Sequence, residues 1–269
     1  LRKIGGGPMI RTIGVADRET LEQNLKRLKL RHVRDTLDDI NEIALEEEPS
    51  YLDFLAYIVQ EEVNGRENTQ RQRRMKAARF PAWRTLDGFD FSYQTSVSQQ
   101  TIRDLAKLEF ITKRENLILL GPPGVGKSHL AIALGIEAVN AGYHVLFTTM
   151  DDLAAKMYAS LADGSLAQYM RSLLRNDLII LDEVGYLTLD KTASDHLFQL
   201  ISRAYENISL IVTSNLDFSE WGTLFASPGT AAALLDRLLH HAHVINLRGD
   251  SYRIRNRLVP PNPTDAKEG

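Results

Sequence analysis

The chain has 269 residues, is 43% hydrophobic and 25% charged, and carries a formal net charge of −3. These values are typical of a soluble protein with one medium α/β domain and a smaller unit. The absence of cysteine excludes disulfides and thiol nucleophiles and fits a cytoplasmic location. No stretch predicts a membrane span. Residues 1–10 are interpreted as a cloning remnant or tail, and residues 260–269 as a disordered tail.

Residues 11–80 are predicted to form a small helical domain, because their apolar side chains recur at three-to-four spacing. The positions expected in its core are Leu21, Leu25, Leu28, Val33, Leu37, Ile40, Ala44, Phe54, Leu55, Ile58 and Val59. Ser50 and Asp53 have the spacing of a capping box that opens the last helix. Residues 81–95 are rich in turn-forming residues and are interpreted as a linker.

A basic segment runs from Arg66 to Arg84 and contains one acid, Glu67. Such a run is commonly a solvated helix face. The alternative is a surface that contacts nucleic-acid phosphates. Under that alternative, the candidate contacts are Arg71, Arg73, Arg74 and Lys76.

The sequence Gly-Pro-Pro-Gly-Val-Gly-Lys-Ser at 121–128 follows the apolar run 117–120. This is the phosphate-binding loop pattern, in which backbone N–H groups surround phosphates, the lysine reaches the β- and γ-phosphates and the serine ligates Mg²⁺. The helix dipole after the loop adds attraction for the phosphates. The predicted nucleotide-binding residues are Gly121, Pro122, Pro123, Gly124, Val125, Gly126, Lys127, Ser128 and His129. The sequence therefore predicts binding of a nucleoside triphosphate.

Strand and helix patterns alternate after residue 116. Strands are expected at 117–120, 144–148, 178–182, 208–213 and 243–247, and helices at 127–140, 151–175 and 192–205. This alternation predicts an α/β fold with a parallel sheet and helices on both faces. The predicted boundaries of this domain are residues 96–259.

The apolar strand 178–181 ends in two carboxylates, Asp182 and Glu183. We expect Asp182 to hold Mg²⁺ together with Ser128, and Glu183 to orient and deprotonate the attacking water. Asn215 ends the next predicted strand and is a candidate for contacting that water or the γ-phosphate, although a turn-starting asparagine is a serious alternative.

Two arginines are candidates for stabilising the γ-phosphate. Arg237 lies on a predicted helix, from which it is expected to fold back onto the same subunit's γ-phosphate. Arg203 ends the helix 192–205 and is a candidate arginine finger for a neighbouring subunit. Each is alternatively an ordinary surface arginine. His240, His241 and His243 show no carboxylate or cysteine at ligand spacing, so they are interpreted as structural.

Four strings carry a resemblance to a known family: Gly-Pro-Pro-Gly-Val-Gly-Lys-Ser, Leu-Ile-Ile-Leu-Asp-Glu-Val-Gly-Tyr, Val-Thr-Ser-Asn, and Leu-Asp-Arg-Leu followed by Val-Ile-Asn-Leu-Arg-Gly-Asp-Ser-Tyr-Arg. With these strings the chain resembles AAA+ ATPases of the initiator and helicase-loader clade. Within the clade it is most similar to the IstB family of insertion-sequence transposition helpers, with the helicase loader DnaC as close kin. The resemblance implies an AAA+ domain with a central five-stranded parallel sheet.

The resemblance also implies roles for individual residues. Asn215 matches the first sensor, Arg237 matches the second sensor, and Arg203 matches the finger loosely. A pair of extra helices, here Leu153–Tyr158 and Leu166–Leu174, is implied between the second and third strands. Its basic residues Lys156, Arg171 and Arg175 become candidate DNA contacts.

The sequence thus predicts a Mg²⁺-dependent ATPase that forms helical or ring oligomers on duplex DNA. It is expected to select target DNA and recruit a transposase, in association with a bacterial nucleoid. A DnaC-like loader of the replicative helicase is the alternative within the clade. A nucleoside kinase is disfavoured by the absence of a lid with clustered arginines, and a nucleotide-gated scaffold without hydrolysis is disfavoured by the intact Lys127, Asp182 and Glu183.

Overall fold

The computed structural model describes residues 17–252, which divide into two compact units between Gln70 and Arg71. The predicted remnant at 1–10 and the predicted tail at 260–269 lie outside the described residues. No helix within 17–252 is long and apolar enough to cross a membrane. The division between the units lies inside the long helix Tyr51–Ala78, which runs without a break from the first unit into the second. It therefore falls earlier in the sequence than the predicted boundary at residue 80.

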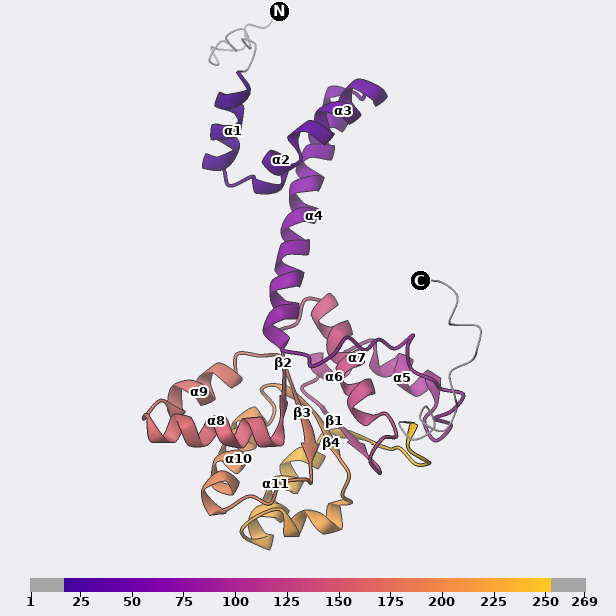
Figure 1. The fold of residues 1–269 in the computed structure, drawn as a ribbon, viewed down its shortest axis with the longest axis vertical. Helices are drawn as coiled ribbons and strands as arrows, with labels where there is room; N and C mark the ends of the chain where they lie inside the picture. Colours follow the sequence, from indigo (N-terminus) through magenta and orange to yellow (C-terminus); the bar gives the residue numbers. More distant parts are fainter. Residues whose placement is uncertain (1–16, 253–269) are drawn as a thin grey trace, which may run out of the picture. The chain divides into compact units, whose positions relative to one another are not determined.

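The first unit is helical, as predicted. Its elements are α1 (Arg18–Arg27), α2 (Arg31–Asp35), α3 (Leu37–Glu47) and the first part of α4 (Tyr51–Ala78) (Figure 1). Leu25, Val33 and Ile40 form the buried core. Four residues that the spacing placed in the core are instead exposed: Leu21, Leu28, Leu55 and Val59. Periodicity alone does not say which face of a helix another element covers.

A buried carboxylate holds two helices of the first unit together. Glu62 of α4 is 5% exposed and accepts hydrogen bonds from the backbone N–H groups of His32 and Val33 at 2.9 and 3.1 Å. These donors begin α2, whose first N–H groups have no partner within the helix. Arg66 donates to the same carboxylate at 2.7 Å. One half of the predicted capping box is present, since Asp53 N donates to Ser50 Oγ at 3.3 Å.

The second unit is built on a five-stranded sheet with the strand order β2-β3-β4-β1-β5, and every pair is parallel. The strands are β1 (Asn116–Leu120), β2 (Val145–Thr149), β3 (Leu178–Val184), β4 (Ser209–Ser214) and β5 (Ala242–Asn246). The helices are α5 (Gln99–Leu105), α6 (Glu109–Thr112), α7 (Lys127–Asn140), α8 (Met150–Ala162), α9 (Leu166–Leu173), α10 (Lys191–Ala204) and α11 (Pro228–Leu239), with a 3-10 helix η1 (Phe218–Thr223). The predicted alternation and the extra helix pair between β2 and β3 are both present.

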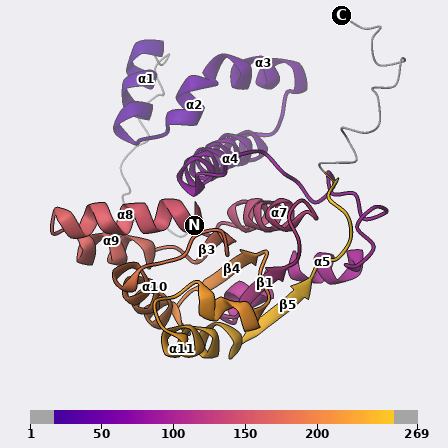
Figure 2. The same ribbon diagram turned by 60° about the horizontal axis from the view of Figure 1, so that its bottom comes forward.

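Alternate residues of the strands enter two separate cores, as expected when both faces of a sheet are covered. On β1, Leu117 and Leu119 pack with α7, whereas Ile118 and Leu120 pack with α8, α10 and α11. Figures 1 and 2 show α7 on one face and α10 and α11 on the other. The carboxyl ends of all five strands lie along one side of the sheet, called here the carboxyl edge. Their amino ends lie along the opposite side, called the amino edge.

Candidate functional site

The phosphate-loop sequence lies at the carboxyl edge, between β1 and α7. Gly121 has φ of 142°, and a Cβ there would lie 2.0 Å from the Leu247 carbonyl oxygen, so only glycine fits. Lys127 is 8% exposed, and its Nζ donates to the carbonyl oxygens of Gly121 and Pro122 at 2.6 and 2.8 Å. The loop thus holds a cation beside the amino end of α7, where an anion is favoured.

Asp182 lies opposite the loop and is 5% exposed. Ser128 Oγ donates to its Oδ1 at 2.8 Å, and the hydroxyl of Thr213 donates to the same oxygen. Thr213, which precedes Ser214 at the end of β4, was not among the predicted site residues. Its polar side chain in an apolar strand was the available signal. The two hydroxyls fix the orientation of the carboxylate.

Glu183 departs from regular strand geometry. It has φ of 63°, and the pairing of β3 with β4 shifts register between Leu181 and Val184, as in a β-bulge. Its N–H donates to Thr213 Oγ1 at 3.0 Å. The bulge leaves Asp182 buried and Glu183 exposed, and both line the same cavity.

Asn215 follows β4 directly and also lines this cavity. Its Oδ1 is buried and has no hydrogen-bond partner among residues 17–252. Buried polar atoms are generally paired, so this amide oxygen is available to a ligand or a water molecule.

The cavity has a volume of about 1030 Å³ and joins the phosphate loop to β3, β4, α8 and α9, which suits a small-molecule or cofactor site. Lys156 of α8 and Tyr169 of α9 contribute to its wall. Burial raises the pKa of the Tyr169 phenol, because the charged phenolate is disfavoured away from water.

The predicted linker 81–95 is a wall of this cavity. Phe89 packs edge-on against the His129 ring at 5.3 Å between centroids, and His129 Nε2 is hydrogen-bonded to the Thr85 carbonyl at 2.8 Å. Gln94 donates to the Val125 carbonyl of the loop at 3.0 Å. His129 and Gln94 therefore tie the 81–95 segment to the phosphate loop.

The segment after β5 closes the other side of the phosphate loop. Tyr252 N donates to the Gly124 carbonyl at 3.0 Å, and the Tyr252 ring packs edge-on against Tyr93 at 5.2 Å between centroids. Tyr93 Oη donates to the Asp250 carbonyl at 3.2 Å. No sequence pattern indicates this contact, because it joins segments that are far apart in the chain.

Arg203 and Arg237 lie at the amino edge, because each is in the last turn of a helix that precedes a parallel strand. Next to Arg237, the Leu238 carbonyl accepts from Asn116 Nδ2 at the start of β1. β1 has 5 residues, so the two edges are roughly 16 Å apart, more than the length of an arginine side chain. Arg237 instead stacks on Phe198 at 4.8 Å, on the side of the sheet away from its own phosphate loop.

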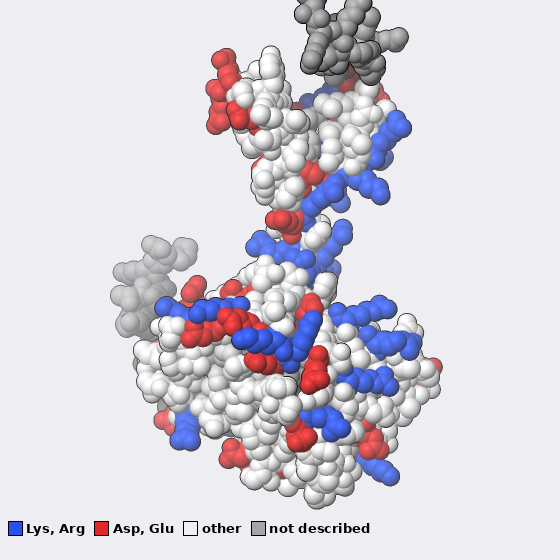
Figure 3. All heavy atoms as spheres, turned by 180° about the vertical axis from the view of Figure 1, so that it is seen from behind, with Lys and Arg blue, Asp and Glu red and all other residues white. Residues whose placement is uncertain are grey.

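The predicted DNA contacts occupy the surface of the second unit. Arg71, Arg73 and Lys76 are exposed on α4, whereas Arg74 is partly buried. Lys156, Arg171 and Arg175 are exposed. Figure 3 shows Lys and Arg side chains gathered on the side that carries α8 and α9, at the right of that view. Exposure agrees with either alternative, a solvated face or a phosphate-contacting one.

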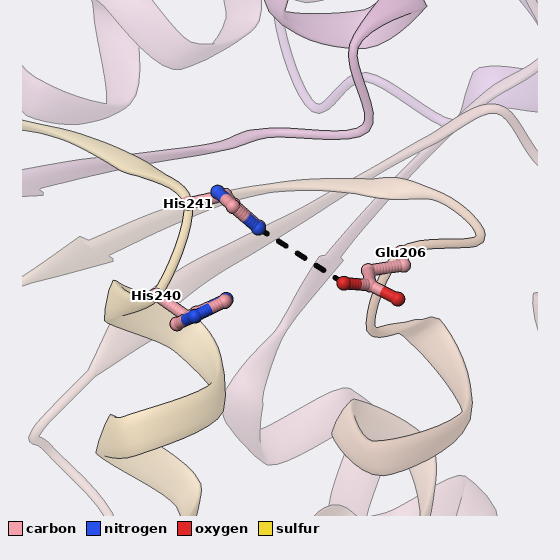
Figure 4. A group of neighbouring side chains, drawn as sticks. All are labelled: Glu206, His240 and His241. Carbon is pink, nitrogen blue, oxygen red and sulfur yellow. Dashed lines mark ion pairs between the residues drawn. The ribbon is translucent and has the colours of Figure 1, made fainter.

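The histidine cluster has a carboxylate neighbour that its sequence spacing did not reveal. His241 Nε2 lies 4.0 Å from Glu206 Oε1 (Figure 4), and Glu206, His240 and His241 present ligand-type atoms within 4.8 Å of one another. His243 is separate, since its Nε2 lies 2.8 Å from Glu115 Oε2. The three histidines were interpreted as structural because no carboxylate lies at ligand spacing from them in the sequence. The folded chain brings the Glu206 carboxylate beside His241, so this reason no longer holds.

Comparison with known proteins identifies the family. A family model described as IstB-like ATP binding protein matches residues 23–259. The chain belongs to this family. Among its relatives, the insertion sequence IS21 ATP-binding protein of Pseudomonas aeruginosa is 42% identical over 88% of this chain and 89% of the relative. The insertion sequence IS5376 ATP-binding protein of Geobacillus stearothermophilus is 38% identical over 89% of this chain and 96% of the relative.

Solved structures agree on the fold. AMPPCP-bound DnaA from Aquifex aeolicus has a TM-score of 0.53 at 23% identity, covering 65% of this chain and 54% of DnaA. The DnaC helicase loader has a TM-score of 0.52 at 19% identity, covering 65% of this chain and 98% of the loader. These likenesses confirm the AAA+ fold. Together with the family, they establish this IstB-like chain as an ATP-binding ATPase of the AAA+ type.

Proposed function

We propose that this IstB-like ATPase hydrolyses ATP with Glu183 as the base, and that ATP controls assembly of its subunits on duplex DNA during transposition. The observation that carries the proposal is the pairing of Ser128 with Asp182 beside the exposed Glu183, in one cavity with the phosphate loop. Hydroxyl and carboxylate oxygens are the donors that Mg²⁺ prefers. These two residues therefore fit a Mg²⁺ ion, which neutralises phosphate charge when bound.

The remaining residues of the cavity have separate tasks. Lys127 exchanges its two carbonyl partners for β- and γ-phosphate oxygens, because a charged acceptor forms the stronger hydrogen bond. Glu183 accepts a proton from the attacking water, and its exposed position leaves room for that water. Asn215 Oδ1, which has no partner among residues 17–252, accepts a hydrogen bond from the water's other O–H and so orients the water. The wall formed by Phe89 and Tyr252 encloses the nucleoside.

The arrangement of the two arginines supports catalysis between subunits. Arg203 and Arg237 lie at the amino edge, and the nucleotide cavity lies at the carboxyl edge. A subunit that offers its amino edge to the cavity of the next forms a head-to-tail interface, which repeats as a ring or a helix. An arginine from the neighbour then faces the γ-phosphate, so hydrolysis removes the charge that holds the interface. Arg237 thus becomes a second candidate finger beside Arg203.

A mixing experiment tests this arrangement. Glu183→Gln has a defective site and intact arginines, whereas Arg237→Ala has an intact site and one arginine missing. Each variant alone should hydrolyse ATP at least tenfold more slowly than wild type. A mixture should regain activity, because the Arg237→Ala site meets the arginine of the Glu183→Gln subunit. The same mixture is made with Arg203→Ala in place of Arg237→Ala. If neither mixture regains ATP hydrolysis, catalysis between subunits is refuted.

We further propose that the DNA-bound assembly recruits the transposase of an insertion sequence. The relatives at 42% and 38% identity are named as insertion-sequence proteins and match nearly their full length, whereas the helicase loader is similar at 19% identity. The exposed Arg73 and Lys76 of α4, with Lys156 beside the cavity, offer cations for duplex phosphates. Contacts of this kind bind DNA with little dependence on sequence.

The DNA proposal is tested by reversing charge at Arg73 and Lys76 together. Duplex affinity should fall for every sequence, and the dependence of log K on log salt should become flatter by about two units. The matched control is Lys107→Glu and Lys113→Glu, which changes the same number of charges near α5 and α6. Equal losses of DNA affinity in both double variants would mean that only the net charge of the protein matters, and not contacts made by Arg73 and Lys76. Capture of the transposase by ATP-loaded but not ADP-loaded protein on DNA would support the recruitment step.

A further inference from the structure

Glu206, His240 and His241 come together at the amino edge of the sheet, away from the nucleotide cavity. Glu206 follows α10, and the two histidines follow α11. Their side chains are exposed and present one ligand-type atom each, all within 4.8 Å of one another. Figure 4 shows His241 directed at the Glu206 carboxylate, from which its Nε2 is 4.0 Å away.

The electrostatic setting favours a cation. Both α10 and α11 end at this place, and the carboxyl end of a helix carries a partial negative charge. Glu206 adds a full negative charge. The residue has φ of 59°, which directs the chain from α10 toward β4 in a tight turn. Two helix ends and one carboxylate therefore lie beside the two imidazoles.

The imidazole of His240 is held in a defined orientation. Its Nδ1 lies 2.7 Å from the Tyr205 hydroxyl, and its ring packs against the His241 ring at 4.2 Å between centroids. Histidines that bind metals are commonly oriented by a hydrogen bond of this kind at one ring nitrogen. Tyr205 thus acts as a positioning residue for His240.

We propose that Glu206, His240 and His241 form a binding site for a divalent transition-metal cation, best matched by Zn²⁺. Two imidazoles and one carboxylate are a ligand set that Zn²⁺ accepts, whereas Mg²⁺ prefers oxygen ligands alone. Bonds of about 2.0–2.2 Å put tetrahedral ligand atoms roughly 3.4 Å apart. The three exposed side chains reach this spacing by small rotations. Three protein ligands leave the fourth position for water or for a donor from another molecule.

Isothermal titration of the full chain with ZnCl₂, in excess Mg²⁺ to occupy the oxygen ligands of Ser128 and Asp182, tests the site. One equivalent should bind. His241→Asn and Glu206→Gln should each weaken binding at least tenfold, and Tyr205→Phe should weaken it severalfold. The matched control is His243→Asn, which removes a histidine that is 49% exposed and paired with Glu115. This variant should bind Zn²⁺ like wild type.

Two further measurements complete the test. Co²⁺ in place of Zn²⁺ should give visible absorption bands of tetrahedral coordination, and His240→Asn should remove them. Because the cation joins the ends of α10 and α11, Zn²⁺ at a hundredfold its Kd should raise the Tm of wild type by roughly 5–10 °C. The proposal is overturned if no stoichiometric binding occurs, or if His243→Asn loses as much affinity as His241→Asn. Equal losses would mean scattered binding to surface histidines.

Discussion

Replacing Thr213 by valine removes one hydroxyl while preserving the shape of a side chain buried in β4. That hydroxyl donates to the Asp182 carboxylate and accepts the N–H of Glu183 at 3.0 Å. Valine therefore leaves a buried carboxylate with one donor fewer and a backbone N–H without its acceptor. The Ser128 hydroxyl alone then orients Asp182.

The expected magnitude follows from these two bonds. A hydrogen bond to a charged group contributes about 1.5–3 kcal/mol, and an unsatisfied buried donor costs about 1–3 kcal/mol. Partial relaxation reduces the sum, so the second unit should lose about 2–4 kcal/mol of stability, or about 5–15 °C in Tm. Turnover of ATP should fall about tenfold or more, because both acidic residues are displaced. The Mg²⁺ concentration that gives half-maximal turnover should increase.

The assay compares Thr213→Val with Thr148→Val on β2, by calorimetry and by steady-state ATP hydrolysis over a range of Mg²⁺ concentrations. Thr148 also lines the cavity, but its hydroxyl donates to the Thr149 carbonyl at 3.2 Å. The control should lose about 1 kcal/mol or less and keep its Mg²⁺ dependence. If both variants behave alike, Thr213 does not position the two acidic residues.

Three further substitutions have defined outcomes. Lys127→Ala should lose ATP binding, measured with a fluorescent nucleotide, and with it any ATP-driven assembly seen by sedimentation; normal oligomers would refute control by nucleotide. Glu62→Gln tests a pH effect. Burial alone would raise the pKa of the Glu62 carboxyl, but hydrogen bonds from Arg66 and from two backbone N–H groups have the larger combined effect. They hold the pKa of Glu62 below its ordinary value. Wild type should therefore be the more stable in urea unfolding near pH 7, and its advantage should disappear as pH falls through the lowered pKa; an advantage independent of pH would contradict this. Gly65→Ala should destabilise the first unit, although alanine favours helices by about 1 kcal/mol, because its Cβ would meet the His32 ring at 2.1 Å; an increase in Tm would contradict the close packing.

Local patterns predicted the strands and the phosphate loop well, since each depends on neighbouring residues. The predicted helix 127–140 matches α7, and the acidic residues at 182 and 183 line the cavity with the loop. Thr213 could not be assigned in the same way, because its role depends on the register between β3 and β4. The contacts of the 81–95 segment and of Tyr252 join distant parts of the chain, which periodicity does not report.

Arg237 was misplaced for a different reason. A helix that precedes a parallel strand must end at the amino edge, where that strand begins. This rule was available from the predicted order of helix and strand, and it places Arg237 away from its own subunit's phosphate loop. No comparable rule indicated that Glu206 lies near the histidines, because Glu206 meets His241 only through the packing of α10 beside α11.

The two ends of the ATPase fold meet at the phosphate loop. The incoming segment reaches it through Gln94, and the outgoing segment reaches it through Tyr252. The Ser96 hydroxyl accepts from the N–H of Arg248 at 2.9 Å, which ties the two segments together. The backbone of the phosphate loop is therefore bonded directly to the segment that precedes the sheet and to the segment that follows it. A rearrangement of the loop would have to break or move hydrogen bonds in both segments.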